Sequence, residues 1–316
     1  FGKSTFLSML HSYYDLKQKD DFERLFGELA IGKNPTPEHN RYLVLRLEFT
    51  GLSTGGTPET LASEFLERLR LACREILWRY RAVLPSPDAL VEALQHATSP
   101  SGLLLALISV LSVCEQKAYI LIDEYDNFTN DLIFRGHIKT YEQLLHATGW
   151  VREFYKTLKE GATLGVIARI FITGVAPVTL DDLGSGANIF KYLYLSEPFQ
   201  AMTGFTEEEV RALLKPRLQE MGVPEQLEET LEVLRHHYDG YRFTPHHAQG
   251  IFNPILILHF FSQYSRPGVI PPVMLDHNLR MDYGRLRMLL SGREPAPRPI
   301  NVKLLLEVLE TGELTA

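Results

Sequence analysis

The sequence is poor in cysteine, and this limits the class of protein that it can encode. Among 316 residues there are only two cysteines, Cys73 and Cys114. Both lie in apolar helical patterns, far from any spacing typical of metal ligands. We therefore expect two buried, reduced thiols and an intracellular protein, either cytoplasmic or nuclear.

Excess positive charge and long apolar runs are missing as well. The formal net charge is -7, which argues against a surface that coats nucleic acid. The longest apolar run, Leu103 to Cys114, is too short to cross a bilayer and is better interpreted as a core helix. The sequence therefore gives no support for nucleic acid or a membrane as a partner.

What the sequence does contain is a phosphate-binding pattern at its beginning. In a phosphate-binding loop, backbone N–H groups surround the β-phosphate, the lysine reaches the β- and γ-phosphates, and the next hydroxyl binds Mg²⁺. The apolar spacing from Thr5 to Leu16 predicts a helix whose N-terminus would point at the anion. The residues that fit the loop are Gly2, Lys3, Ser4 and Thr5, with Lys3 on the phosphates and Ser4 on the metal.

A second stretch, Ala118 to Glu124, is an apolar run that ends in two carboxylates. A buried parallel strand that delivers charge at its carboxyl end has this pattern. We expect Asp123 to hold Mg²⁺ and Glu124 to orient and polarise an attacking water. The alternative is that a helix merely starts at Lys3 and that a strand happens to end in Asp-Glu.

A third strand, Ile167 to Thr173, ends in a polar side chain beside the expected Asp123 strand. Thr173 is a candidate sensor of the γ-phosphate or the lytic water. The other interpretation, that Thr173 only begins a turn, stays open.

The order of these stretches predicts an α/β fold. Further strands are expected at Arg41 to Phe49 and Lys191 to Leu195, and alternating strands and helices favour a P-loop NTPase parallel sheet with helices on both faces. Ligands then bind at the carboxyl ends of the strands. We expect a loop from Asn127 to Lys139, one helix from Thr140 to Glu160 and a second loop from Asp181 to Asn188.

The phosphate-binding pattern is only partly present. The full pattern has a strand and a first glycine before Gly2, so we expect these residues to be a fragment whose N-terminal strand lies outside the sequence. Lys3 and Asp123 are 120 positions apart, which requires a helical insertion between them. This insertion is where we expect contacts with a protein partner or self-association.

The predicted domains follow from a change of pattern near Met202. Residues 1–200 would form the P-loop core, and 201–291 would form a small helical lid domain. Thr206 and Glu209 have the spacing of a capping box that starts a lid helix. Residues 292–316, which begin with a proline-rich stretch, would be a linker and the start of a further segment.

Together these stretches make the chain similar to a known family. It resembles the AAA-ATPase-like family of predicted ATPases over most of Phe1 to about Leu290. The stretches that carry the resemblance are FGKST at Phe1, LIDEYD at Leu121, FITGV at Phe171, GFTEEEV at Gly204, YDGYRF at Tyr238 and NPILIL at Asn253.

The resemblance implies a P-loop core of the AAA+ or STAND kind with a helical lid. It implies phosphate and Mg²⁺ contacts at Gly2 to Thr5, metal and water roles at Asp123 and Glu124, and a sensor role at Thr173. The chain departs from the family after Asp126, where Asn127-Phe128-Thr129 replaces the usual x-Pro-Leu. Many members carry a C-terminal nuclease, but nothing after Gly292 supplies its carboxylates and lysine, so we expect no nuclease activity.

Other polar residues have a structural as well as a functional interpretation. His236 and His237 could sense the nucleotide from the lid or complement a helix end. Three arginines could stabilise charge as arginine fingers or simply be solvated: Arg169, Arg211 and Arg242. The pair His246-His247 has no matching ligands, so we expect no metal beyond Mg²⁺.

Two functions remain open. In the first, the chain binds ATP with Mg²⁺ between core and lid and hydrolyses it through Glu124. In the second, it is a nucleotide-gated interaction switch with negligible turnover. Glu124 favours the first, and the lack of an obvious arginine finger favours slow turnover. A kinase with a small acceptor is a weaker third, because no acceptor-binding motif is present.

Overall fold

The computed structural model of the chain describes residues 2–84, 88–146, 148–175, 178–184, 188–193, 196–238, 250–264, 266 and 269–274. The chain divides into two compact units. The described part of the first, here the sheet unit, lies within Leu7–Ile189. The described part of the second, here the helical unit, comprises Gly2–Phe6 and residues from Phe190 onward. Each unit is described by itself.

Three parallel strands form the sheet of the sheet unit. They are β1 Leu43–Glu48, β2 Ala118–Asp123 and β3 Ile167–Ile172, paired in the order β1-β2-β3. Every residue of β2 is buried, which explains why its sequence is a continuous apolar run rather than an alternating one. Glu48 pairs in register with Asp123, so the two strands end together. The α/β fold and the parallel sheet predicted from the sequence are confirmed.

Helices surround this sheet. Helix α1 spans Lys3–Tyr14, and its residues from Leu7 onward belong to the sheet unit. The other helical segments of the sheet unit, among the described residues, are η1 Leu16–Asp21, α2 Phe22–Phe26, α3 Ala30–Lys33, α4 Pro58–Arg79, α5 Asp88–His96, α6 Pro100–Val113, α7 Asn127–Phe134, α8 Ile138–Leu145, α9 Trp150–Thr163 and α10 Val178–Leu183.

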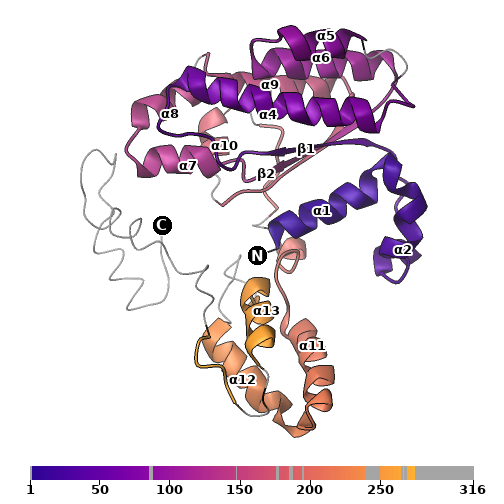
Figure 1. The fold of residues 1–316 in the computed structure, drawn as a ribbon, viewed down its shortest axis with the longest axis vertical. Coiled ribbons are helices and arrows are strands. Elements are labelled where there is room, and N and C mark those ends of the chain that lie inside the picture. Colours follow the sequence, from indigo (N-terminus) through magenta and orange to yellow (C-terminus); the bar gives the residue numbers. More distant parts are fainter. Residues whose placement is uncertain are drawn as a thin grey trace. The chain divides into compact units, whose positions relative to one another are not determined.

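The helices lie on both faces of the sheet. Helix α4 packs against β1, α9 packs against β3, and α6 packs against both of these helices. Figure 1 shows α4, α6 and α9 on one side of the sheet and α1 on the other. The first side is rich in aromatic contacts, such as Phe49 with Phe65 at 4.6 Å between ring centroids. Burial of these large apolar side chains is the main force that holds the layers together.

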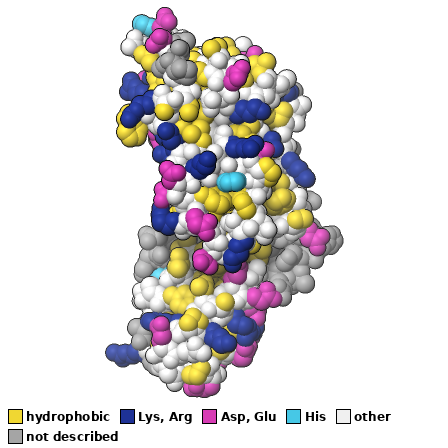
Figure 2. Space-filling view, turned by 90° about the vertical axis from the view of Figure 1, so that its right-hand side faces the viewer, with side chains coloured by type: hydrophobic (Ala, Val, Ile, Leu, Met, Phe, Trp, Pro, Cys, Tyr) yellow, Lys and Arg dark blue, Asp and Glu magenta, His cyan; other side chains and the backbone are white. Residues whose placement is uncertain are grey.

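Charge and apolar character at the surface follow the composition. On the face that Figure 2 shows, Lys and Arg side chains lie among Asp and Glu side chains. Within the described ranges, no helix combines the length and the apolar character that a bilayer crossing requires.

Cys73 and Cys114 are free, and burial raises the pKa of the Cys73 thiol to about 12, so this thiol is inert at neutral pH.

Several predicted local elements are wrong. The loop expected from Asn127 to Lys139 contains helix α7, because Phe128 and Leu132 share one helical face and are both buried. The single helix expected from Thr140 to Glu160 is two helices, α8 and α9, separated around Gly149. The chain turns so tightly there that a side chain at Gly149 would collide with the backbone of Leu144, which glycine avoids.

Two further expectations fail after β3. Helix α10 covers the start of the loop expected from Asp181 to Asn188. The described residues of the strand expected at Lys191–Leu195, residues 191–193, are not in a strand.

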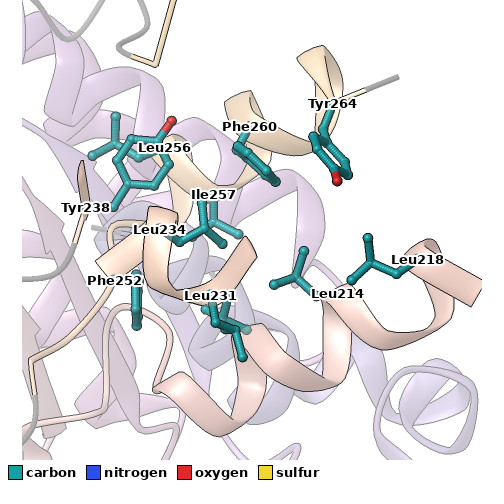
Figure 3. Packing of buried hydrophobic residues seen from close by; sticks show 11 residues of the cluster. Leu214, Leu218, Leu231, Leu234, Tyr238, Phe252, Leu256, Ile257, Phe260 and Tyr264 are labelled. Atoms are coloured by element: carbon teal, nitrogen blue, oxygen red, sulfur yellow. The ribbon is translucent and has the colours of Figure 1, made fainter. Parts of the chain in front are cut away.

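The described residues of the helical unit form three main helices around one apolar core. They are α11 Glu207–Glu220, α12 Leu227–Tyr238 and α13 Pro254–Gln263, with the short segments η3 Glu197–Phe199 and η4 Pro224–Gln226. Figure 3 shows leucines of α11 and α12 pointing toward Phe260 and Ile257 of α13. Thr206 and Glu209 form the predicted capping box at the start of α11.

A buried carboxylate fixes the far end of α1 to the sheet unit. Asp15 is fully buried, accepts a hydrogen bond from Tyr80 Oη at 2.9 Å, and pairs with Arg79 through Nε at 2.8 Å. Burial alone would raise the pKa of Asp15. The hydrogen bonds from His11, the Lys17 N–H and Arg79 outweigh burial and hold this pKa below its usual value.

Substitution Asp15→Asn should therefore lower the free energy of unfolding by about 3 kcal/mol, because Arg79 loses its buried partner. A native pKa below the unfolded one gives stability that is present above about pH 4 and is lost as pH falls through the native pKa. The difference between wild type and variant in urea unfolding should thus shrink in acid. Asp21→Asn, which removes an exposed partner of Arg24, should cost less than about 1 kcal/mol. Equal losses in both variants would contradict the role of Asp15.

Candidate active site at the carboxyl ends of the strands

Helix α1 runs across the sheet in the direction opposite to the strands. Near its end, the carbonyl of Tyr14 accepts a hydrogen bond from the N–H of Tyr42, just before β1. Earlier in the helix, the Ser8 hydroxyl accepts one from Arg46, which lies farther along β1. The chain thus moves backward along β1 as α1 advances. The N-terminal direction of α1 is therefore the direction in which the strands end.

The sheet face under α1 changes from apolar to charged toward the carboxyl ends. Side chains alternate between the faces of a strand, so Val44, Arg46 and Glu48 share one face of β1. Val44 belongs to the apolar cluster that contains Leu7 of α1, whereas Arg46 and Glu48 are exposed. On β2 the same face leads from the buried Leu121 to Asp123. On β1 and β2 the charged groups of this face thus lie at the end toward which α1 points.

The Asp123 carboxylate is the centre of this polar end. It is 3% exposed, and its Oδ1 accepts hydrogen bonds from the Thr173 hydroxyl at 2.6 Å and from the Glu124 N–H at 3.1 Å. Its Oδ2 lies 3.7 Å from the Arg46 guanidinium. The structure therefore brings Thr173 into direct contact with Asp123. Arg46 is not among the site residues predicted from the sequence, although its position two residues after a buried valine, in a strand that neighbours Asp123, is a signal that marks it.

Glu124 occupies an unusual backbone conformation. Its φ is +48°, in the left-handed region that non-glycine residues rarely adopt. The carbonyl of Glu124 accepts from the Asn127 N–H at 3.0 Å, and its side chain accepts from the Asn127 amide at 3.1 Å. Such a conformation is strained and persists only where the surrounding structure holds it. Residues in such conformations cluster at active sites. The Glu124 side chain stays partly exposed.

Asp126 links the turn after β2 to the turn after β3. It is fully buried, and its two oxygens accept from the Val175 N–H at 3.1 and 2.9 Å and from the Asn130 amide at 2.9 Å. A side chain at Gly174 would collide with the ring of Tyr125, so only glycine fits there. Asp126 is not among the site residues predicted from the sequence. Asp126 keeps the turn that carries Thr173 against the turn that carries Glu124.

The phosphate-binding residues lie at the start of α1. Gly2 has a φ of +75°, which glycine adopts without strain, and its carbonyl accepts from the Phe6 N–H at 2.9 Å as the helix begins. Lys3, Ser4 and Thr5 form the first turn of α1. These residues belong to the helical unit, so their approach to Asp123 stays a prediction.

The polar groups suit a magnesium ion rather than a transition metal. Mg²⁺ prefers oxygen ligands and is usually bound by one or two carboxylates together with substrate phosphates. Asp123 supplies such a carboxylate, and Ser4 is the predicted hydroxyl ligand. The part of the chain that the structure describes contains no group of three or more His, Cys, Asp or Glu residues that could form a metal cage.

The remaining candidates lie away from this cluster or form other contacts. Arg169 is exposed and bonds to the Ala168 carbonyl, and Arg211 pairs with Glu207 and Glu228 within the helical unit. His236 and His237 are exposed at the end of α12. Three further candidates lie outside the described residues, namely Arg242, His246 and His247.

Substitution Asp126→Ala should lower the free energy of unfolding by about 2–3 kcal/mol, because the Val175 N–H and the Asn130 amide would lose their buried acceptor. The measurement is urea unfolding followed by circular dichroism. Glu142→Gln, at an exposed position of α8, is the control and should leave the midpoint unchanged. The same midpoint for Asp126→Ala and wild type would refute this role of Asp126.

Comparison with known proteins identifies the family of the chain. The family model described as predicted AAA-ATPase, AAA-ATPase-like, matches residues 1–184. The match covers more than half of the chain and includes the start of α1, the end of β2 and the end of β3. Neither the curated proteins nor the solved structures provided a match. The chain therefore belongs to the AAA-ATPase-like family of predicted AAA-ATPases.

Proposed function

We propose that the chain binds ATP with Mg²⁺ and hydrolyses it at the carboxyl ends of the strands. The observation that carries the proposal is the direction of α1, whose N-terminal end faces the same way as Asp123 and Thr173. A helix N-terminus and the carboxyl ends of parallel strands both favour phosphate binding. Membership of a predicted AAA-ATPase family supports nucleotide binding.

The start of α1 would supply the phosphate and metal contacts. The helix begins at Lys3, and Ser4 precedes Ser8 by one turn on the same helical face. Because Ser8 bonds to Arg46 beside Asp123, this spacing supports an approach of Ser4 to Asp123. Lys3 would then bind the β- and γ-phosphates. Ser4 and Asp123 would hold Mg²⁺, which supplies charge neutralisation of the phosphates.

Glu124 and Thr173 would prepare the attacking water. Glu124 follows Asp123 directly in a strained turn, its side chain is partly exposed, and the hydrogen bond from the Asn127 amide limits the rotation of its carboxylate. A carboxylate held in this way can orient a water molecule by accepting a hydrogen bond from it. The Thr173 hydroxyl donates a hydrogen bond to Oδ1 of Asp123 and so fixes the orientation of that carboxylate.

A nucleotide-gated switch with slow turnover is the second candidate. It is favoured by the engagement of Arg211 with Glu207 and Glu228, because an arginine finger must be able to reach the transferred phosphate. A protein partner or self-association and an intracellular location belong to both proposals. Turnover measured on a single enzyme-bound ATP distinguishes a fast enzyme from a slow switch.

Substitution Lys3→Ala should weaken ATP binding at least about 100-fold, because the charge that pairs with the β- and γ-phosphates is lost. Binding is measured by calorimetry with ATP and Mg²⁺. Lys33→Ala, at the end of α3, removes the same charge and should leave binding unchanged. Equal binding by the Lys3 variant and wild type would refute the phosphate site.

Substitution Glu124→Gln should slow phosphate release in a single turnover about 100-fold and leave ATP binding within about threefold. The glutamine keeps the size of the side chain and its bond to Asn127, so only the charge is tested. The measurement is phosphate release after mixing excess protein with ATP and Mg²⁺. If release is equally fast in the variant, the proposed role of Glu124 is wrong, although nucleotide binding can still hold.

A further inference from the structure

Both oxygens of the Asp123 carboxylate have partners from the protein. Thr173 and the Glu124 N–H share Oδ1, and the Arg46 guanidinium lies 3.7 Å from Oδ2. The carboxylate is almost completely buried, so a negative charge at this position needs compensation. Among these partners, only Arg46 brings a full positive charge. A metal ion that bound this carboxylate would therefore compete with Arg46 for its charge.

Arg46 is held so that such an exchange is possible. Its Nη1 donates to the Ser8 hydroxyl at 3.1 Å, while its Nη2 faces Asp123. The Arg46 side chain is 36% exposed, compared with 4% for the Asp123 side chain. The ion pair thus has one fixed, buried member and one member that can move toward solvent. The long arginine side chain can leave Asp123 without disturbing the strand.

Arg46 also lies on the side where a nucleotide would bind. It is on the sheet face under α1, near the carboxyl end of β1 and one strand away from Asp123. Without a cation, the Asp123 charge would repel a polyphosphate bound there. With Arg46 beside it, the carboxylate is neutralised from within the chain.

We propose that Arg46 is the built-in counter-ion of Asp123, which neutralises this carboxylate until Mg²⁺ replaces it and so allows nucleotide to bind without metal. The inference rests on the proposed nucleotide site. Arg46 would determine how strongly nucleotide binding depends on Mg²⁺, and it would not contact the reacting atoms. Arg46 therefore controls the coupling between Mg²⁺ and nucleotide.

The test is the affinity for a fluorescent ADP analogue, measured in excess EDTA and in saturating Mg²⁺ for each variant. Arg46→Gln should weaken binding in EDTA about five- to tenfold and leave binding in Mg²⁺ within about twofold, because only the metal-free site loses its cation. Arg46→Lys keeps a positive charge and should retain most of the binding in EDTA. Adding Asp123→Asn to Arg46→Gln removes both charges and should restore binding in EDTA.

A control separates the local effect from a change of overall charge. Arg74→Gln, at an exposed position of α4, gives the same change of net charge and should alter neither affinity. Thermal unfolding of each variant checks that the fold is kept.

Three outcomes would overturn the inference. Equal weakening by Arg46→Gln in EDTA and in Mg²⁺ would mean that Arg46 binds phosphate directly or supports the fold. No weakening in either condition would mean that Asp123 does not depend on Arg46. If wild type bound the ADP analogue in neither condition, the proposed nucleotide site itself would fail, and the inference with it.

Discussion

The packing of α1 against the sheet is the interaction on which the rest of the candidate site depends. Leu7 is buried in the apolar cluster under α1, and Tyr14 stacks on Tyr119 with ring centroids 4.7 Å apart. These contacts fix both the position and the direction of the helix. If the helix ran the other way, its dipole would place partial negative charge near Asp123, and phosphate binding there would be opposed. Apolar packing at one end of α1 thus determines the electrostatics at the other.

Three buried carboxylates hold different parts of this arrangement. Asp15 anchors the C-terminal side of α1 to α4, Asp126 joins the turns after β2 and β3, and Asp123 faces the candidate site. Each is satisfied by donors from a different element, which is the condition for burying a charge. Asp15 and Asp126 are both fully buried, and both oxygens of each accept hydrogen bonds. Asp123 differs because one of its partners, Arg46, is partly exposed and lies 3.7 Å away without a hydrogen bond to it.

The sequence predicts those parts of the site that follow from local pattern. The apolar run of β2 predicts a buried strand, and because parallel strands end at one edge, Asp123 and Thr173 are expected to lie near each other. Their direct hydrogen bond agrees with this expectation. The capping residues Thr206 and Glu209 are equally local, since both partners lie within one helical turn.

Other parts depend on contacts between residues far apart in the chain, and no local pattern contains them. Arg46 gains its role only through the register of β1 with β2. Asp126 gains its role only through the turn after β3, which brings Val175 to it. Helix α7 has polar residues of low helix propensity, and burial of Phe128 and Leu132 decides its conformation.

The long insertion between β1 and β2 affects the rate of folding more than the stability of the fold. The entropy lost on closing a chain segment grows only with the logarithm of its length, so α4, α5 and α6 add little to the thermodynamic cost of pairing Leu43 with Ala118. Pairing of such distant residues is nevertheless slow, because the entropy of closing the segment is lost before the contacts between the strands stabilise the structure. The three helices pack against one another as neighbours along the chain and can therefore form before the strands pair. The edge that carries Asp123 would then be completed late in folding, and the insertion could vary in length without weakening it.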